Sequence, residues 1–134
     1  MANELYPKWK EQLLQFTANN NLSAGTVKVA LIDTGAYQYN ASHQYWSSAS
    51  AGLIGTPQTL TSKTFTGAVF DAADVTFSAV TGDTIEAIII YIDTGTASTS
   101  PLVAYMDTGI TGFPLTPTGV SVTISWSPSG IFQL

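Results

Sequence analysis

Residues 84–93 read TIEAIIIYID, and this stretch decides the fold. Every residue from Ala87 to Ile92 is apolar, so a strand here would be apolar on both of its faces. Such a strand is typical of the centre of a sheet that is covered on both sides. The polar segment TGTASTS at 94–100 follows, and then a second apolar run, PLVAYMD at 101–107. This order predicts an antiparallel hairpin with a central first strand.

Alternating apolar and polar residues predict further strands around this hairpin. TVKVALID at 26–33 places Val27, Val29 and Leu31 on one face, and DVTFSAV at 74–80 does the same with Val75, Phe77 and Ala79. The sharpest alternation is GVSVTISWSPSG at 119–130, which predicts a buried face made of Val120, Val122, Ile124 and Trp126. Residues 56–70 predict two short strands, whereas residues 35–55 have no clear period and predict a long loop.

The N-terminal segment, residues 1–22, has helical spacing instead. Pro7 suits the first turn of a helix, where its missing N–H group costs nothing. Trp9, Leu13 and Phe16 then recur at helical intervals and predict one apolar stripe on a short helix. We expect this helix to rest on a sheet or to contact a neighbouring protein.

These patterns together predict a mainly β protein that forms a single β domain over residues 1–134. We expect an antiparallel β-sandwich or open barrel of about seven to eight strands with one short N-terminal helix. A chain of 134 residues is long enough to bury a sizeable core without disulfides.

The composition argues against several classes of function. The chain has no cysteine, which rules out disulfides, thiolate metal sites and a cysteine nucleophile. Only 10% of the residues are charged, and the net charge of -5 would repel nucleic acid. The first ten residues, MANELYPKWK, lack signal-peptide features, and no apolar run is long enough for a membrane span. We therefore expect no nucleic-acid partner and no membrane association.

Asp-Thr-Gly follows an apolar run at 33–35, 93–95 and 107–109. The triplet is a signature of aspartic proteases, in which two carboxylates about 3 Å apart share a proton. Asp93 and Asp107 should lie at opposite ends of the hairpin, roughly 20 Å apart, which leaves only Asp33 to pair with either of them or with its own copy in a dimer. The alternative is a strand-ending turn in which Asp caps the following N–H groups and Gly takes a positive φ. We favour structural turns, without catalytic residues, at Asp33, Gly35, Asp93, Gly95, Asp107 and Gly109.

Three other groups of residues are weighed as sites. His43 is the only histidine, and no nucleophile motif accompanies it. Asp71 and Asp74, with Asp83 and Glu86 further on, could hold calcium, but the EF-hand pattern is absent and an acidic turn is favoured, so we predict no metal and no cofactor. The aromatic residues in the long loop could stack on sugars or contact another subunit, and we favour contacts. They are Tyr37, Tyr39, Tyr45 and Trp46.

Several stretches resemble a family of small proteins encoded among the structural genes of tailed bacteriophages. They cover nearly the whole chain: YPKWKEQLL (6–14), GTVKVALIDT (25–34), YNASHQ (39–44), GAVFDAADVTFSAVTGD (67–83), EAIIIYIDTG (86–95), SPLVAYMDTGITGFPLTPTG (100–119) and GIFQL (130–134). The resemblance implies a non-enzymatic virion protein, assembled in the cytoplasm of the bacterial host. It implies most directly a capsid decoration or cement protein.

The implied partners are the major capsid protein and sister subunits, arranged as a homotrimer. We expect the N-terminal segment and the aromatic loop to supply the contacts, through Tyr6, Trp9, Leu13, Phe16, Tyr37, Tyr39, Tyr45 and Trp46. Two alternatives stay open, a tail or neck component and a carbohydrate-binding module on the virion surface.

Overall fold

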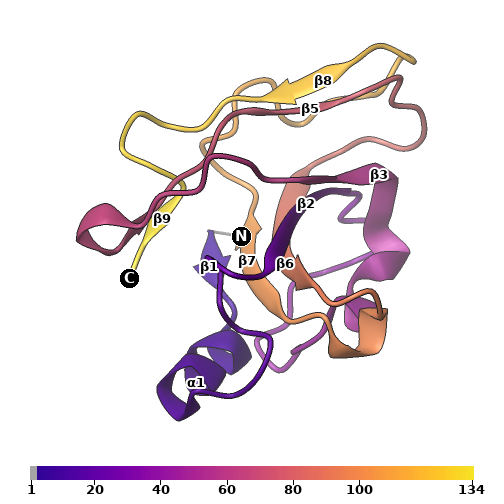
Figure 1. Ribbon diagram of the computed structural model, residues 1–134. Coiled ribbons are helices and arrows are strands. Elements are labelled where there is room, and N and C mark those ends of the chain that lie inside the picture. Colours follow the sequence, from indigo (N-terminus) through magenta and orange to yellow (C-terminus); the bar gives the residue numbers. More distant parts are fainter. Residues whose placement is uncertain (1–2) are drawn as a thin grey trace.

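Strand β6 (Ala87–Asp93) lies at the centre of a five-stranded antiparallel sheet in the computed structural model, which describes residues 3–134. The strand order is β1-β7-β6-β2-β3, with β1 at Glu4–Leu5, β7 at Leu102–Met106, β2 at Thr26–Ile32 and β3 at Leu53–Thr59 (Figure 1). Residues 87–92 are all buried, so the predicted central strand is confirmed. The predicted hairpin is also confirmed, because β6 and β7 pair antiparallel from Ile88 opposite Met106.

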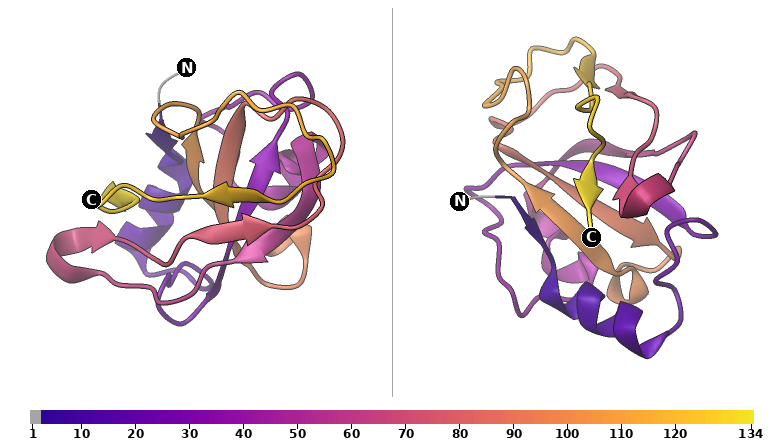
Figure 2. Two further views of the ribbon diagram at one scale, coloured as in Figure 1. Left: turned by 90° about the horizontal axis from the view of Figure 1, so that it is seen from above. Right: turned by 90° about the vertical axis from the view of Figure 1, so that its left-hand side faces the viewer.

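Four short strands form a second layer. β5 (Val75–Phe77) pairs with β8 (Val122–Ile124), and β4 (Val69–Phe70) pairs with β9 (Phe132–Gln133). β5 and β8 pass over the main sheet, as the view from above shows (Figure 2). The long loop covers the other face of the sheet, where its aromatic rings pack on Tyr91 and Tyr105. This arrangement explains why β6 is apolar on both faces.

The prediction of a mainly β, antiparallel fold with one α-helix is confirmed, with nine strands in residues 3–134 instead of seven or eight. β1, β4 and β9 have two residues each, which is too short for an alternation to be read from the sequence. Four 3-10 turns complete the elements: η1 (Trp46–Ser48), η2 (Ser50–Gly52), η3 (Thr66–Ala68) and η4 (Ala97–Thr99).

Helix α1 spans Pro7–Gln15 and begins with Pro7 in its first turn, as the sequence predicts. Trp9 is buried and Leu13 partly buried, but the predicted stripe ends there. Phe16 closes the helix in the left-handed conformation with φ 53°, and its side chain is 94% exposed. The helical period therefore does not extend to Phe16, because the chain leaves the helix one residue earlier.

Three further predictions need correction at the ends of strands. β3 begins at Leu53, inside the predicted loop, because Leu53 pairs with Ile32. Ala79 is exposed in a turn with φ 50°, and Val80 is buried in its place. Val120 is exposed because β8 does not begin until Val122. At Ala79 and Val120 a turn shifts the chain at a point where the alternation of residue types continues.

Candidate interaction surface

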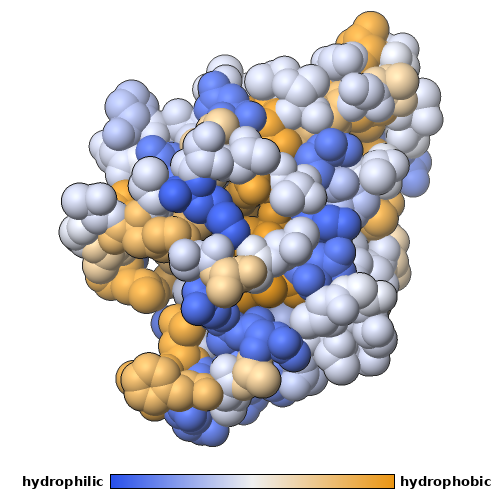
Figure 3. All heavy atoms as spheres, in the orientation of Figure 1, coloured by the Kyte–Doolittle hydropathy of each residue, from blue (hydrophilic) through white to orange (hydrophobic). Residues whose placement is uncertain are grey.

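An open, mainly apolar groove of about 570 Å³ lies between α1, the loop after it, Phe65 and the C-terminal Leu134. In the space-filling view it is the hollow at the lower left, where hydrophobic residues gather around it (Figure 3). Its apolar lining consists of Trp9, Leu13, Phe16, Leu22, Phe65 and Leu134. Exposed apolar patches of this kind are typical of protein interaction sites.

A chain of aromatic rings connects this groove to the second layer. The rings of Trp9 and Phe132 meet edge to face at 5.9 Å, those of Phe132 and Phe70 lie 5.3 Å apart, and those of Phe70 and Phe65 lie 5.6 Å apart. Such ring pairs stabilise a fold by more than the burial of their apolar area alone accounts for. The position of α1 relative to Phe65, and so the width of the groove, is therefore fixed by the core.

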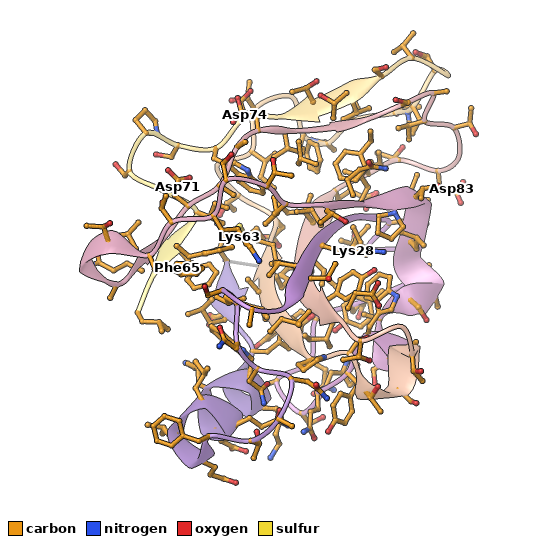
Figure 4. The ribbon with its side chains drawn as sticks, viewed as in Figure 1. Lys28, Lys63, Phe65, Asp71, Asp74 and Asp83 are labelled. Atoms are coloured by element: carbon orange, nitrogen blue, oxygen red, sulfur yellow. The ribbon has the colours of Figure 1, made fainter. Side chains whose placement is uncertain are left out.

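The loop that forms one wall of the groove is held by polar contacts. The side-chain amide of Asn20 donates to Thr17 Oγ1 at 2.7 Å and to the carbonyl of Ala18 at 2.8 Å. Lys63, which follows β3, points its ammonium group at the same loop (Figure 4). It donates to the carbonyls of Leu22 at 2.7 Å and Gly25 at 2.8 Å. These contacts hold the loop beside the helix.

Phe16 is the most informative residue of the groove. A left-handed conformation costs an L-residue about 1–2 kcal/mol, and glycine or asparagine is the usual residue at this position of a helix end. Burial of the Phe16 ring does not offset this conformational free energy, since the side chain is 94% exposed. Neither the backbone nor the core therefore favours phenylalanine here, which points to a role outside the fold of the single chain.

Two buried polar atoms in the lining have no hydrogen-bond partner among residues 3–134. They are Nε1 of Trp9 and Oδ1 of Asn20, and both side chains are almost completely buried. Buried polar atoms of this kind are uncommon in native folds, because leaving one without a partner costs free energy.

Four of the eight predicted contact residues belong to the core, which corrects the sequence-based assignment. Tyr6, Trp9, Tyr37 and Trp46 are buried, and Trp9 touches the groove only as part of its floor. The hydroxyl groups of Tyr6 and Tyr37 share a hydrogen bond of 2.8 Å, and the Tyr37 hydroxyl also contacts Nδ1 of His43 at 3.0 Å. Burial raises the pKa of both phenols, so they stay protonated at neutral pH.

The remaining predicted residues lie on three different parts of the surface. Leu13 and Phe16 line the groove, Tyr39 lines a separate cleft, and Tyr45 lies beside Pro101 at a third position. The aromatic loop thus does not form one contact surface. Leu22, Phe65 and Leu134 line the groove but were not identified from the sequence. Phe65, an isolated large apolar residue among threonines, was the clearest available signal.

The three Asp-Thr-Gly triplets form strand-ending turns that differ in detail. Asp33 accepts the N–H of Gly35 at 2.8 Å, and Asp93 accepts that of Gly95 at 2.9 Å. In the third turn, the side-chain oxygen of Asn3 accepts the N–H groups of Asp107 at 2.8 Å and Thr108 at 3.0 Å. The expected cap by Asp107 is thus replaced by one from the N-terminal segment.

The glycines of these turns also differ. Gly95 and Gly109 adopt positive φ values of 89° and 74°, as predicted, but Gly35 does not. A Cβ atom on Gly35 would lie 3.0 Å from Oδ1 of Asp33. Close approach to the capping carboxylate, and not the backbone angle, therefore accounts for glycine at this position.

The strand register places Asp93 far from the other two aspartates. Asp93 pairs with Thr26 at one end of β2, whereas Ile32, which precedes Asp33, pairs with Ala87 at the other end. Asp33 and Asp107 do lie at the same end of the sheet, after β2 and β7, but β6 runs between them. Their backbones are thus two strand spacings apart, about 9–10 Å. Asp33 is occupied in capping its own turn.

The aspartates weighed as calcium ligands lie in separate turns. Asp71 accepts the N–H of Ala72 at 2.9 Å, and Asp74 accepts that of Trp126 at 3.0 Å. Asp83 lies at the far side of the molecule from both (Figure 4). Within residues 3–134, no three His, Cys, Asp or Glu side chains are grouped so that they could hold a metal ion.

No known family model matches this chain, and no curated protein matches it significantly. Among the helices of residues 3–134, none has the length and apolar character needed to cross a membrane. The geometry of the surface therefore carries the functional argument.

The ion pair at the end of β6 predicts how the stability of the fold depends on pH. Lys28 Nζ lies 2.9 Å from Asp93 Oδ2, and this contact, followed by the N–H of Gly95, lowers the pKa of Asp93 below its usual value of 3.8. A carboxyl group whose pKa is lower in the folded than in the unfolded chain stabilises the fold at pH values above its unfolded pKa. This stabilisation is lost as the pH falls through the lowered pKa of the folded state. We expect Asp93→Asn to make stability less dependent on pH in the acidic range.

Denaturant unfolding from about pH 2 to about pH 6 measures this effect. Asp83→Asn is the matched control, since Asp83 is exposed and its replacement removes the same charge. Equal acid sensitivity of Asp93→Asn and the original protein would contradict the prediction.

Proposed function

We propose that this protein is a non-enzymatic structural component of a tailed-bacteriophage virion, and that it decorates the head and binds across subunits of the major capsid protein. The observation that carries the proposal is the apolar groove beside α1, with Phe16 held outward at its edge. The resemblance to phage structural proteins over nearly the whole chain supports the same role. We propose that the groove receives an apolar segment of the capsid subunit.

The energetics of the groove suit this role. Covering a large apolar side chain contributes about 1.5–3 kcal/mol relative to leaving it exposed. Phe16, Phe65 and Leu134 are the exposed apolar side chains around the groove. In a homotrimer, each subunit would present one such groove to the shell, and binding at several sites at once raises the overall affinity without any new contact. A decoration protein stabilises a capsid in this way.

The composition is compatible with a position on the outside of a particle. The net charge of -5 disfavours contact with the packaged genome. The absence of cysteine makes the fold independent of redox conditions, both in the host cytoplasm and in the released virion. By contrast, the carbohydrate-binding alternative rested on the aromatic residues Tyr37, Tyr39, Tyr45 and Trp46. Of these, Tyr37 and Trp46 are buried, and the ring of Trp46 is stacked on that of Tyr91 at a centroid distance of 4.4 Å.

Replacing Phe16 with asparagine tests the proposal, because binding and stability should change in opposite directions. Asparagine tolerates the left-handed conformation, so we expect the free energy of unfolding to rise by up to about 1 kcal/mol. Loss of the exposed ring should weaken binding to purified heads that lack this protein by roughly 30-fold, the effect of truncating a residue that contributes strongly to an interface. Cosedimentation with such heads and denaturant unfolding provide the two measurements.

Leu14→Asn is the matched control. Leu14 is also a large apolar residue at the end of α1, 84% exposed, but it does not line the groove. We expect unchanged binding and a loss of about 0.5 kcal/mol, because asparagine is a poorer helix former than leucine. If Phe16→Asn bound heads as tightly as the original protein, the groove would not be the contact surface. Difference electron microscopy of particles with and without the protein then distinguishes the head from the tail or neck.

A further inference from the structure

A polar cleft of about 520 Å³ lies between α1 and the aromatic loop. One wall is the helix face formed by Lys8, Glu11, Gln12 and Gln15, which recur at intervals of three and four residues. The apolar groove uses the neighbouring face of the helix, and the two linings share only Gln12 and Thr17. The polar cleft is therefore a separate candidate site, and its volume is in the range of ligand pockets.

The opposite wall of the polar cleft is held in place by backbone pairing. The N–H group of Leu102 donates to the carbonyl of Gln44 at 2.9 Å, and Tyr45 lies opposite Pro101 in an antiparallel bridge. The Tyr45 hydroxyl accepts the side-chain N–H of Gln44 at 3.0 Å, and the Tyr45 side chain stays partly exposed. This wall is thus formed before any ligand binds.

The charges in the polar cleft compensate each other. Lys8 and Glu11 are the only charged side chains among the described residues that line it, and they form an ion pair at 3.1 Å. A site without net charge attracts neither anions nor cations over a distance. The cleft therefore favours a neutral ligand over a phosphate group or a basic peptide.

Side-chain amides supply the hydrogen-bonding groups of the polar cleft. The amides of Gln12, Gln15 and Asn19 form no hydrogen bond with any other residue in 3–134, and the side-chain carbonyl of Gln44 forms none either. Each amide group carries both donors and an acceptor. A ligand rich in hydroxyl groups, which also donate and accept, can use all of these amides.

The apolar part of the lining narrows the class of ligand further. Apart from Ala18, it consists of the rings of Tyr45 and Pro101. A pyranose ring has an apolar face of C–H groups that packs on an aromatic ring, while the hydroxyl groups at its rim reach polar side chains. An apolar peptide would instead need pockets for its side chains, and this lining has too few apolar residues to form them.

We infer that the polar cleft binds a neutral glycan, with Tyr45 as the stacking surface and the amides of Gln12, Gln15 and Gln44 as hydrogen-bonding groups. The aromatic loop takes part through Tyr45 alone, because Trp46 belongs to the core. This function is additional to head binding and does not depend on Phe16, which does not line the polar cleft. Phe16→Asn should therefore keep glycan binding, so that either proposal can fail without the other.

Titration of the isotope-labelled full chain with neutral disaccharides, followed by amide NMR shifts, tests the inference. The panel consists of maltose, cellobiose, lactose and diacetylchitobiose. We expect at least one of them to shift residues 8–19, 44–46 and 99–102, with a dissociation constant on the order of 10 mM or tighter, as suits a small ligand in an open cleft. Sorbitol has hydroxyl groups but no ring, and it should cause no such shifts.

Tyr45→Ala should reduce the affinity for that sugar by about tenfold or more, since it removes the stacking surface. Tyr39→Ala is the matched control, because Tyr39 is also a partly buried tyrosine of the aromatic loop but lines a different cleft. Gln15→Ala gives a second test if Tyr45→Ala does not fold, since alanine suits a helix and removes only the amide.

Three results would overturn the inference. The first is the absence of shifts at these residues with every sugar of the panel up to about 50 mM. The second is an equal response to sorbitol, or an affinity that Tyr45→Ala leaves unchanged. The third is a set of shifts produced by acetyl-tetraalanine amide and by none of the sugars, which would assign the polar cleft to a peptide.

Discussion

Replacing Trp46 with alanine should lower the free energy of unfolding by about 3–5 kcal/mol, the usual cost of removing a buried tryptophan. The side chain is only 7% exposed, and its ring lies parallel to that of Tyr91, with the centroids 4.4 Å apart. Tyr91 belongs to the central strand β6, so the cavity left by the substitution would open directly against the core of the sheet. Denaturant unfolding measures the loss.

The same substitution separates a structural role from a contact role for the aromatic loop. At temperatures where the variant is still folded, we expect it to bind phage heads as the original protein does, because Trp46 does not line the groove. Phe16→Ala is the matched control: it also removes an aromatic ring, but one that is 94% exposed, and it should change stability by no more than about 0.5 kcal/mol. A Trp46→Ala protein that keeps its stability and loses head binding would contradict this interpretation.

The contrast between Trp46 and β6 explains how much of the fold could be predicted. The run from Ala87 to Ile92 can bury all of its apolar side chains only in a strand with both faces covered, so the sequence strongly constrains the position of this strand in the fold. The loop of residues 35–55 has no period, and an aromatic residue there can turn inward or outward without changing any sequence pattern. Tyr37 turns inward because its hydroxyl bonds to that of Tyr6, between β1 and α1, and Trp46 turns inward because its ring stacks on Tyr91 of β6.

The candidate sites were predictable to different degrees. Helical spacing placed Trp9 and Leu13 on one side of α1, which is the helical side of the groove. The opposite side consists of Phe65 and Leu134, which approach α1 only through the pairing of β4 with β9 and the aromatic contacts of the second layer. The separate cleft that Tyr39 lines depends even more on topology, since Glu86 and Asp107 both line it only because the start of β6 pairs with the end of β7.

Replacing Lys63 with methionine should lower the free energy of unfolding by about 2–3 kcal/mol and loosen the wall of the groove. Hydrogen bonds to charged groups contribute about 1.5–3 kcal/mol, and Lys63 donates to the carbonyls of Leu22 and Gly25. Methionine keeps most of the aliphatic part of the side chain, so the loss reports mainly on the ammonium group. Denaturant unfolding measures the global effect, and amide hydrogen exchange measures the local one.

The local effect should be confined to residues 21–25, because the Lys63 ammonium donates to the carbonyls of Leu22, Ser23 and Gly25. Gly25 packs closely at the end of this loop, since a Cβ atom there would lie 2.7 Å from the carbonyl oxygen of Asn21 and 2.8 Å from Ile92. Lys10→Met is the control: Lys10 is exposed, so its replacement removes a charge without freeing any loop carbonyl. If Lys63→Met left exchange in this loop unchanged, the wall would be held by Asn20 and Asn21 alone. Faster exchange together with weaker binding to heads would instead show that the ammonium group of Lys63, in the segment after β3, sets the shape of the groove.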